Sequence, residues 1–213
     1  MRLVTTGWDE ALASALDERE EAGLLRTLRA FAGTGRALVA EDGRELLNFS
    51  SNDYLGLAGH PALAEAAARA ARNHASGSTA SRLIVGGYPA LDELEARVAE
   101  LKGTEAALVI GSGFLANTSV IPALAGGGDA IFSDALNHAS IVDGCRLSRA
   151  EVHRFRHRDV EHLDWLLVAS PAERKLIVTD TVFSMDGDVA RLEEIAELKE
   201  RHEIGRASCR ERV

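Results

Sequence analysis

Cysteines, aromatic residues and long apolar runs are all scarce in this 213-residue sequence. The two cysteines, Cys145 and Cys209, are too few and too far apart to indicate a disulfide framework or a zinc site, and we expect no bound metal. No stretch approaches the roughly 18 consecutive apolar residues that a membrane helix needs. The opening "MRLVTTGWDE" also has no apolar core of signal-peptide type. These absences predict a cytoplasmic protein with no membrane partner.

An excess of positive charge is also lacking. The formal net charge is -9 at pH 7, which argues against a nucleic-acid partner, because such proteins normally present a basic face. The 46% hydrophobic and 27% charged content is ordinary for a globular protein, and the length allows a substantial buried core.

Strand and helix patterns alternate from residue 104 onward. We expect strands at 105–110, 130–134, 151–155 and 175–183, with amphipathic helices between them. Before them, the sequence predicts a charged helix from Trp8 to about Phe31, a hairpin around Asp42-Gly43, and helices that begin at Pro61 and Pro89. The alternation is typical of an α/β fold, a mostly parallel sheet covered by helices.

The segment "VIGSGFLAN" contains the sharpest local motif. A strand leads into Gly111-Ser112-Gly113 and a helix follows, so free backbone N–H groups can face a phosphate. Gly111, Gly113 and Ala116, with Asp134 further on, also match the fingerprint of NAD-binding domains. The motif alone leaves a phosphate cradle, an NAD-dependent dehydrogenase and an empty turn open.

Two further segments follow the carboxyl ends of predicted strands. His138 in "LNHASIVDG" begins a helix, and Ser184 lies in the loop "TVFSMDGDVA". Parallel strands bring such ends to one crevice, so both residues are expected near Gly113. Each also has an ordinary explanation, namely a histidine bonded to helix backbone and an Asp-Gly turn.

The segment "VHRFRHRDVEH" has three histidines at metal-like spacing, His153, His157 and His162. No clustered acids or cysteines complete a ligand shell, so we interpret this segment as a solvated strand edge.

Five motifs in order resemble the α-oxoamine synthases. They are "NFSSNDYLGL", "GSTASRL", "GSGFLAN", "NHASIVDGCRLSRA" and "VFSMDGD", and the resemblance covers Trp8 to His202. The family uses pyridoxal phosphate, has the aspartate-aminotransferase fold (fold type I), forms homodimers and condenses an amino acid with an acyl thioester. The resemblance therefore implies an incomplete fold of this type, with 1–60 as an N-terminal helix and hairpin segment and 61–203 as part of the cofactor-binding domain.

The resemblance also assigns residues. Gly113 and Phe114 match the pair whose backbone N–H groups hold the cofactor phosphate. His138 matches the histidine stacked on the pyridine ring and lying against the substrate, and Ser184 matches a serine at the cofactor. Arg26 matches an arginine that meets the acyl substrate. Asn52 matches an asparagine near the carboxylate of the amino-acid substrate.

Within the family, the "SSNDYLGL" wording and Arg26 favour the member that joins L-alanine to a pimeloyl thioester, while sister enzymes that act on other acyl-CoAs stay possible. The family's Schiff-base lysine and the aspartate that pairs with the pyridine nitrogen have no match in this chain. We therefore expect it to have no catalytic lysine and to be inactive alone.

The final stretch "EIGRASCRERV" breaks the helical rhythm of "RLEEIAELKERH" and reverses its charge. Back-translated, it resembles a common sequencing adapter. We therefore expect residues 204–213 to be a non-native tail.

Overall fold

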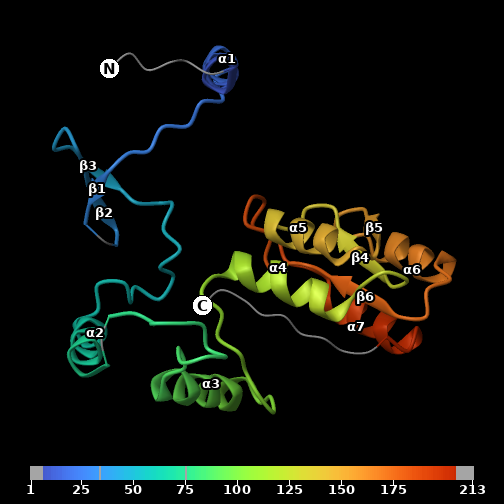
Figure 1. Cartoon of the computed structure of the whole chain (residues 1–213). Helices are drawn as coiled ribbons and strands as arrows, with labels where there is room; N and C mark the ends of the chain where they lie inside the picture. The colour runs from blue at the N-terminus through green and yellow to red at the C-terminus, as the bar shows by residue number, and fades with distance from the viewer. Residues whose placement is uncertain (1–6, 34, 75, 205–213) are drawn as a thin grey trace. The chain divides into compact units, whose positions relative to one another are not determined.

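The computed structural model describes residues 7–33, 35–74 and 76–204. The chain divides into two compact units, Met1–Gly87 and Tyr88–Val213 (Figure 1).

The first unit contains a small antiparallel sheet between two helices in the sequence. Its elements are α1 (Gly7–Glu21), β1 (Phe31–Ala32), β2 (Ala37–Ala40), β3 (Glu45–Leu47) and α2 (Pro61–His74), with strand order β1-β2-β3. The predicted hairpin is confirmed, since β2 pairs with β3 and Gly43 takes the positive φ of 82° that the turn requires. The predicted helix over Trp8–Phe31 is wrong beyond Glu21, because the chain turns at Gly23 with φ 66°.

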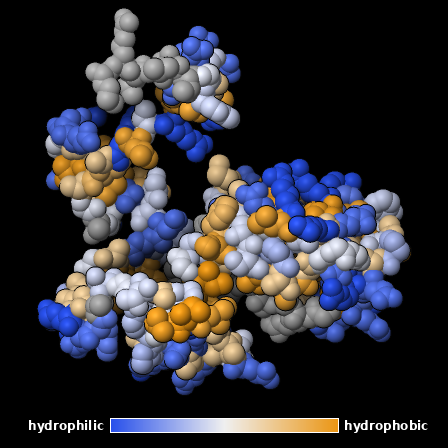
Figure 2. Space-filling model, in the orientation of Figure 1, coloured by the Kyte–Doolittle hydropathy of each residue, from blue (hydrophilic) through white to orange (hydrophobic). Residues whose placement is uncertain are grey.

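Large apolar side chains of the first unit lie exposed. Leu28, Phe49, Tyr54 and Leu83 are each more than four-fifths exposed, and Figure 2 shows orange surface over α1 and the small sheet. Exposed apolar surface of this extent is typical of an interaction face.

The second unit is built on a parallel sheet. Its elements are α3 (Pro89–Lys102), α4 (Gly113–Leu124), β4 (Ala130–Asp134), α5 (Ala139–Ser148), β5 (Glu151–Phe155), α6 (Val160–Ala169), β6 (Lys175–Val178) and α7 (Leu192–Arg201). The strand order is β5-β4-β6, and both pairings are parallel. The predicted alternation of strands and helices is therefore confirmed from residue 113 onward.

The predicted strand at 105–110 is wrong, and the last predicted strand is shorter than expected. Residues 104–112 form no strand, and β6 ends at Val178, although Val182 still forms an isolated bridge with Val189. An apolar run becomes a strand only where a neighbouring backbone hydrogen-bonds to it. No described strand lies beside 104–112 to do so.

The central strand β4 is fully buried and supplies core residues to both faces of the sheet. Phe132 packs with Phe155, Leu163 and Leu167 on the side covered by α6 and α7, whereas Ile131 packs with α4 and α5 residues on the other side (Figure 1). This follows from the period of two in a strand. Truncating a buried phenylalanine such as Phe132 to alanine costs about 3–5 kcal/mol.

Helices α4 and α5 approach each other closely at Gly144. A Cβ built on Gly144 would lie 2.5 Å from the carbonyl oxygen of Asn117 and 3.0 Å from Cδ1 of Ile121. Only a residue without a side chain allows this packing, which sets the position of α4 over the sheet.

Ile204 closes the described part of the chain. It is 8% exposed, packs into the cluster around Phe132 and donates its N–H to the carbonyl of Lys199. The remainder of the predicted tail, 205–213, lies outside the described residues. Among the described helices, none combines the length and apolar character needed to span a bilayer.

Candidate active site at the carboxyl edge of the parallel sheet

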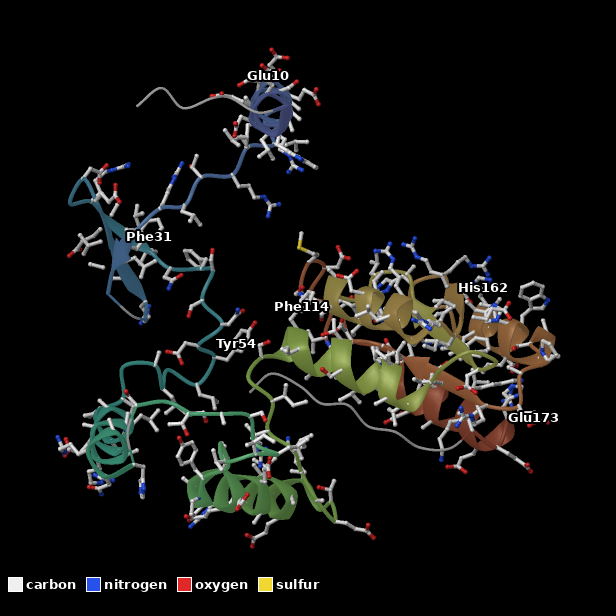
Figure 3. The ribbon with its side chains drawn as sticks, in the orientation of Figure 1. Glu10, Phe31, Tyr54, Phe114, His162 and Glu173 are labelled. Carbon is white, nitrogen blue, oxygen red and sulfur yellow. The ribbon has the colours of Figure 1, made fainter. Side chains whose placement is uncertain are left out.

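The first turn of α4 presents free backbone donors. Ser112 is the N-cap: its Oγ accepts from the N–H of Leu115 at 3.1 Å, and its carbonyl accepts from Ala116. Among the described residues, none accepts from the N–H groups of Gly113 and Phe114. A methyl group at Gly113 would meet nothing within 4 Å, and the Phe114 side chain is 51% exposed at the open end of α4 (Figure 3). This helix start can therefore bind an anion.

A chain of hydrogen bonds links α4 to His138. Asn117, one turn beyond Gly113, donates from Nδ2 to Ser140 Oγ at 2.9 Å, and Ser140 Oγ lies 2.7 Å from His138 Nδ1. The N–H of Ser140 also reaches Nδ1, at 3.2 Å. A backbone N–H can only donate, so Nδ1 is the acceptor and a neutral ring carries its proton on Nε2. The predicted neighbours Gly113 and His138 are thus tied together through α4 and α5.

The backbone of His138 is fixed by the loop that follows β6. Its N–H donates to Asp180 Oδ2 at 2.7 Å. Asn137 uses its whole amide in the same region: Nδ2 donates to Ser133 Oγ at 3.0 Å and to the Val178 carbonyl at 2.8 Å, and Oδ1 accepts from the Asp180 N–H at 2.8 Å. The loops that follow β4 and β6 are therefore joined at the carboxyl ends of these strands.

Ser184 lies at the tip of a narrow loop between β6 and α7. The Phe183 N–H donates to the Asp188 carbonyl at 2.9 Å, and the Gly187 N–H, at φ 74°, donates to the Phe183 carbonyl at 2.8 Å. Phe183 is 2% exposed, whereas Ser184 and the neighbouring Met185 are exposed. The loop thus has a buried neck and an accessible tip at the same edge of the sheet as His138.

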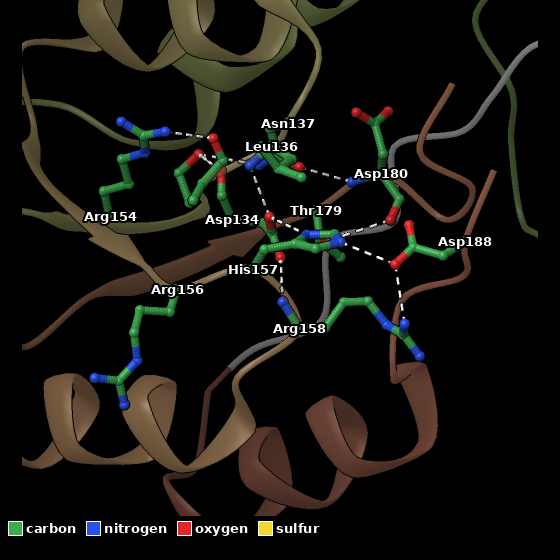
Figure 4. A network of polar contacts seen from close by, with 12 residues as sticks. Asp134, Leu136, Asn137, Arg154, Arg156, His157, Arg158, Thr179, Asp180 and Asp188 are labelled. Carbon is green, nitrogen blue, oxygen red and sulfur yellow. Dashed lines mark hydrogen bonds and ion pairs between the residues drawn. The ribbon is translucent and has the colours of Figure 1, made fainter. Parts of the chain in front are cut away.

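His157 connects this loop to β4 (Figure 4). Its Nδ1 lies 2.8 Å from Asp134 Oδ1, its Nε2 lies 3.0 Å from Asp188 Oδ2, and Arg158 Nη1 lies 2.9 Å from the same Asp188 oxygen. Partial burial lowers the pKa of His157, but the hydrogen bonds to both carboxylates outweigh it and raise the pKa above its usual 6.5. The hydrogen bond from His157 in turn lowers the pKa of Asp188.

The interpretation of 152–162 as a solvated strand edge is wrong for His157. Its side chain is only 23% exposed, and His153, which precedes it, stacks on Phe132 at 5.0 Å between ring centroids. The sequence did not predict that His157 bridges two carboxylates, because these lie 23 and 31 residues from it along the chain. The only hint was that Asp134 ends one predicted strand and Asp188 follows another.

Asp134 is not available for the NAD reading of the glycine motif. Its side chain is 2% exposed, and its carboxylate accepts from the N–H groups of Leu136 and Arg158 as well as from His157. A carboxylate that binds a ribose hydroxyl must keep an acceptor free at the surface. The arrangement therefore disfavours the binding of NAD at the glycine motif.

The two remaining predicted site residues, Arg26 and Asn52, belong to the first unit. Arg26 is exposed and lines a groove of about 530 Å³ with Leu16, Leu24 and a second arginine, Arg19. Asn52 is exposed and accepts a 3.5 Å hydrogen bond from the Tyr54 hydroxyl. The groove combines apolar walls with two guanidinium groups.

Comparison with known protein families gives one extended match. The model of the aminotransferase class I and II family matches residues 44–204, about three quarters of the chain.

Curated relatives agree with this match. An 8-amino-7-oxononanoate synthase of Anaeromyxobacter sp. (strain Fw109-5) is 55% identical over 88% of this chain and 47% of its own length. A putative 8-amino-7-oxononanoate synthase of Bacillus mycoides (strain KBAB4) is 49% identical over 92% of this chain and 50% of its own length. The chain thus spans about half the length of the curated relatives it matches.

Solved structures share the fold. A serine palmitoyltransferase from S. paucimobilis with a bound PLP–myriocin aldimine has a TM-score of 0.83 at 31% identity, over 92% of this chain and 50% of that one. An 8-amino-7-oxononanoate synthase from Francisella tularensis has a TM-score of 0.60 at 29% identity, over 70% of this chain and 41% of that one. The predicted fold type I of pyridoxal-phosphate-dependent transferases is therefore confirmed, and the chain belongs to the aminotransferase class I and II family.

Proposed function

We propose that this chain is part of an 8-amino-7-oxononanoate synthase, a pyridoxal-phosphate-dependent acyltransferase of biotin biosynthesis. The reaction condenses L-alanine with a pimeloyl thioester, either pimeloyl-CoA or pimeloyl-ACP, and releases carbon dioxide. The observation that carries the proposal is the joint placement of an open helix start, a fixed histidine and an exposed serine at one sheet edge. The 55% identity to a relative of that name supports the choice of substrates.

The described residues fit pyridoxal phosphate. The N–H groups of Gly113 and Phe114 would hold its phosphate, because the remaining donors of that turn are already capped by Ser112. His138, with Nδ1 fixed by Ser140, would present the face of its ring to the pyridine and one edge to the substrate. Ser184 would meet the cofactor from the loop tip. When bound, the cofactor withdraws electrons from the α-carbon of the amino acid.

The positions of the lysines support the proposal that the covalent attachment site is not in this chain. The three lysines are Lys102, at the end of α3, Lys175 and Lys199. Lys175 begins β6, at the opposite end of the sheet from His138, and its Nζ donates to the Leu167 carbonyl at 2.7 Å. Lys199 lies on α7 and pairs with its neighbour Glu200. We propose that this chain alone is inactive.

Arg26 and Asn52 are proposed substrate residues. The groove beside Arg26 has leucine walls and two cations, which suits an acyl chain that ends in a carboxylate. Asn52 would bind the carboxylate of L-alanine. The exposed apolar surface of the first unit supports a homodimer in the whole enzyme, which we propose to be cytoplasmic.

The test uses a chain of the full length of its relatives. We expect pyridoxal phosphate to give an absorbance band of a lysine-bound cofactor, and L-alanine with pimeloyl-CoA to yield carbon dioxide and 8-amino-7-oxononanoate. His138→Gln should weaken cofactor binding, whereas His202→Gln, at the C-cap of α7, should not. Turnover of glycine with acetyl-CoA or succinyl-CoA instead would indicate 2-amino-3-ketobutyrate CoA ligase or 5-aminolevulinate synthase. Absence of the band, with NAD bound, would contradict the proposal.

A further inference from the structure

The loop that carries Ser184 is held at its neck by two residues. Phe183 is buried and exchanges backbone hydrogen bonds across the neck with Asp188 and Gly187. The carboxylate of Asp188 accepts from His157 and Arg158, both at Oδ2, while Oδ1 is buried and has no donor among the described residues. The fixation of this carboxylate therefore depends on those two cations.

His157 contacts both sides of the neck and also the sheet. Its ring meets the Phe183 ring edge-on, with centroids 4.4 Å apart and planes at 88°, and its Nε2 reaches Asp188 at 3.0 Å. Its Nδ1 reaches Asp134, the last residue of β4, at 2.8 Å. No other described side chain bonds to both of these carboxylates, as Figure 4 illustrates.

We propose that His157 is a positioning residue, which bridges Asp134 and Asp188 and thereby fixes the Ser184 loop against the carboxyl end of β4. The inference rests on the proposed function, because Ser184 matters there as a cofactor contact. His157 itself does not touch the proposed reacting atoms.

Only a charged histidine can make both contacts at once. Each ring nitrogen faces a carboxylate oxygen, so each must carry a proton, and a neutral ring has one N–H and must release one partner. Two aspartates and the side chain of Arg158 face or adjoin the ring. The other nearby cations are directed elsewhere, because Arg154 donates to the Ala135 carbonyl (Figure 4). Arg156 binds Asp159.

The sign of the pH effect follows from the raised pKa of His157. The bridge is complete below the unfolded value of 6.5 and is lost as pH rises through the higher folded value. Asp188 stays ionised in this window because its pKa is lowered.

The first test measures hydrogen exchange on the 213-residue chain, corrected for intrinsic rates. In His157→Gln at pH 6, the amides of Phe183, Gly187 and Ala190 should exchange roughly tenfold faster than in the wild type. Wild-type protection of these amides should fall as pH rises above 6.5, and the variant should show no such step. The matched control is His202→Gln, which removes a histidine–carboxylate pair with Asp164 and leaves the loop untouched.

Two results with His157→Gln would overturn the assignment. One is unchanged loop protection in His157→Gln; the other is the same pH step in the variant as in the wild type. An equal loss of loop protection in His202→Gln would show a general loss of stability and would also refute it.

The second test separates this inference from the proposed function. In the full-length enzyme, His157→Gln and Ser184→Ala should each raise the Kd for pyridoxal phosphate several-fold, and the double variant should be no worse than the weaker-binding single one. Additive effects would overturn the positioning role. If the wild type binds no pyridoxal phosphate, the proposed function fails, while the exchange experiment still decides whether His157 fixes the loop.

Discussion

Gly144→Ala tests the close contact between α4 and α5. The new methyl would lie 2.5 Å from the Asn117 carbonyl oxygen and 3.0 Å from Ile121 Cδ1, so the helices must move apart. Overpacking of this kind costs about 1–3 kcal/mol. Separation also strains the Asn117–Ser140 hydrogen bond, worth about 1 kcal/mol. Replacing a helical glycine returns about 1 kcal/mol of helix propensity, so we expect a net loss of about 1–3 kcal/mol.

The assay is urea unfolding followed by circular dichroism. With an m-value of about 2 kcal/mol per molar urea, a loss near 2 kcal/mol lowers the midpoint by about 1 M. Gly111→Ala is the matched control, because a methyl there meets nothing within 4 Å and its φ lies outside the left-handed region. It should leave the midpoint within about 0.3 M of the wild type.

Two results of the unfolding assay would refute the reasoning about Gly144. The first is a midpoint for Gly144→Ala equal to or above that of the wild type, which would mean that the helices separate at no cost. The second is an equal shift in both glycine variants. A crystal structure of Gly144→Ala with the Asn117–Ser140 distance still near 2.9 Å would likewise contradict the expected displacement.

Three further outcomes are expected. The hydrogen bond from Arg174 lowers the pKa of Asp129. The contribution of Asp129 to stability is therefore present above the ordinary pKa of 3.8 and is lost as pH falls through the lower folded value. Arg174→Gln should flatten this part of an acid-unfolding curve. Burial raises the pKa of the Cys145 thiol, so in a Cys209→Ser background native protein should resist a thiol reagent at neutral pH and react after unfolding; rapid native reaction would contradict it. Amplification of the gene from source DNA should give other codons in place of those for 204–213, and recovery of the same ten codons would refute the adapter origin.

Local chemistry made most of the fold predictable. Pro89 begins α3, and Gly103 ends it with φ 63°, as a proline at the first position and a glycine after the last predict. The pattern of 130–134 and 151–155 predicts β4 and β5 to the residue, because both strands find their partners within the described sheet. Residues 105–110 have the same apolar character and form no strand. Apolar character indicates burial, but pairing depends on a neighbour that the segment does not contain.

The sequence predicted which residues of the site lie together, but not the contacts that hold them. Gly113 and His138 were expected together at the carboxyl ends of parallel strands, and hydrogen bonds do link α4 to His138, although the strand expected before Gly113 does not form. The bond from Asn117 through Ser140 could not be anticipated, since it depends on how α4 crosses α5 at Gly144. The role of His157 was missed for a related reason: a histidine's partners are set by tertiary packing, and a sequence shows only its immediate neighbours.

The amide of Asn137 has a thermodynamic consequence for ligand binding. Both of its polar atoms are already engaged, with Ser133, Val178 and Asp180, so the backbone under His138 is preorganised before any ligand arrives. A ligand that binds beside His138 would lose little free energy through ordering of this backbone. The entropic cost of binding would instead fall on the exposed tip at Ser184 and Met185. Affinity at this site is therefore expected to respond more to changes that stiffen the tip than to changes in the backbone under His138.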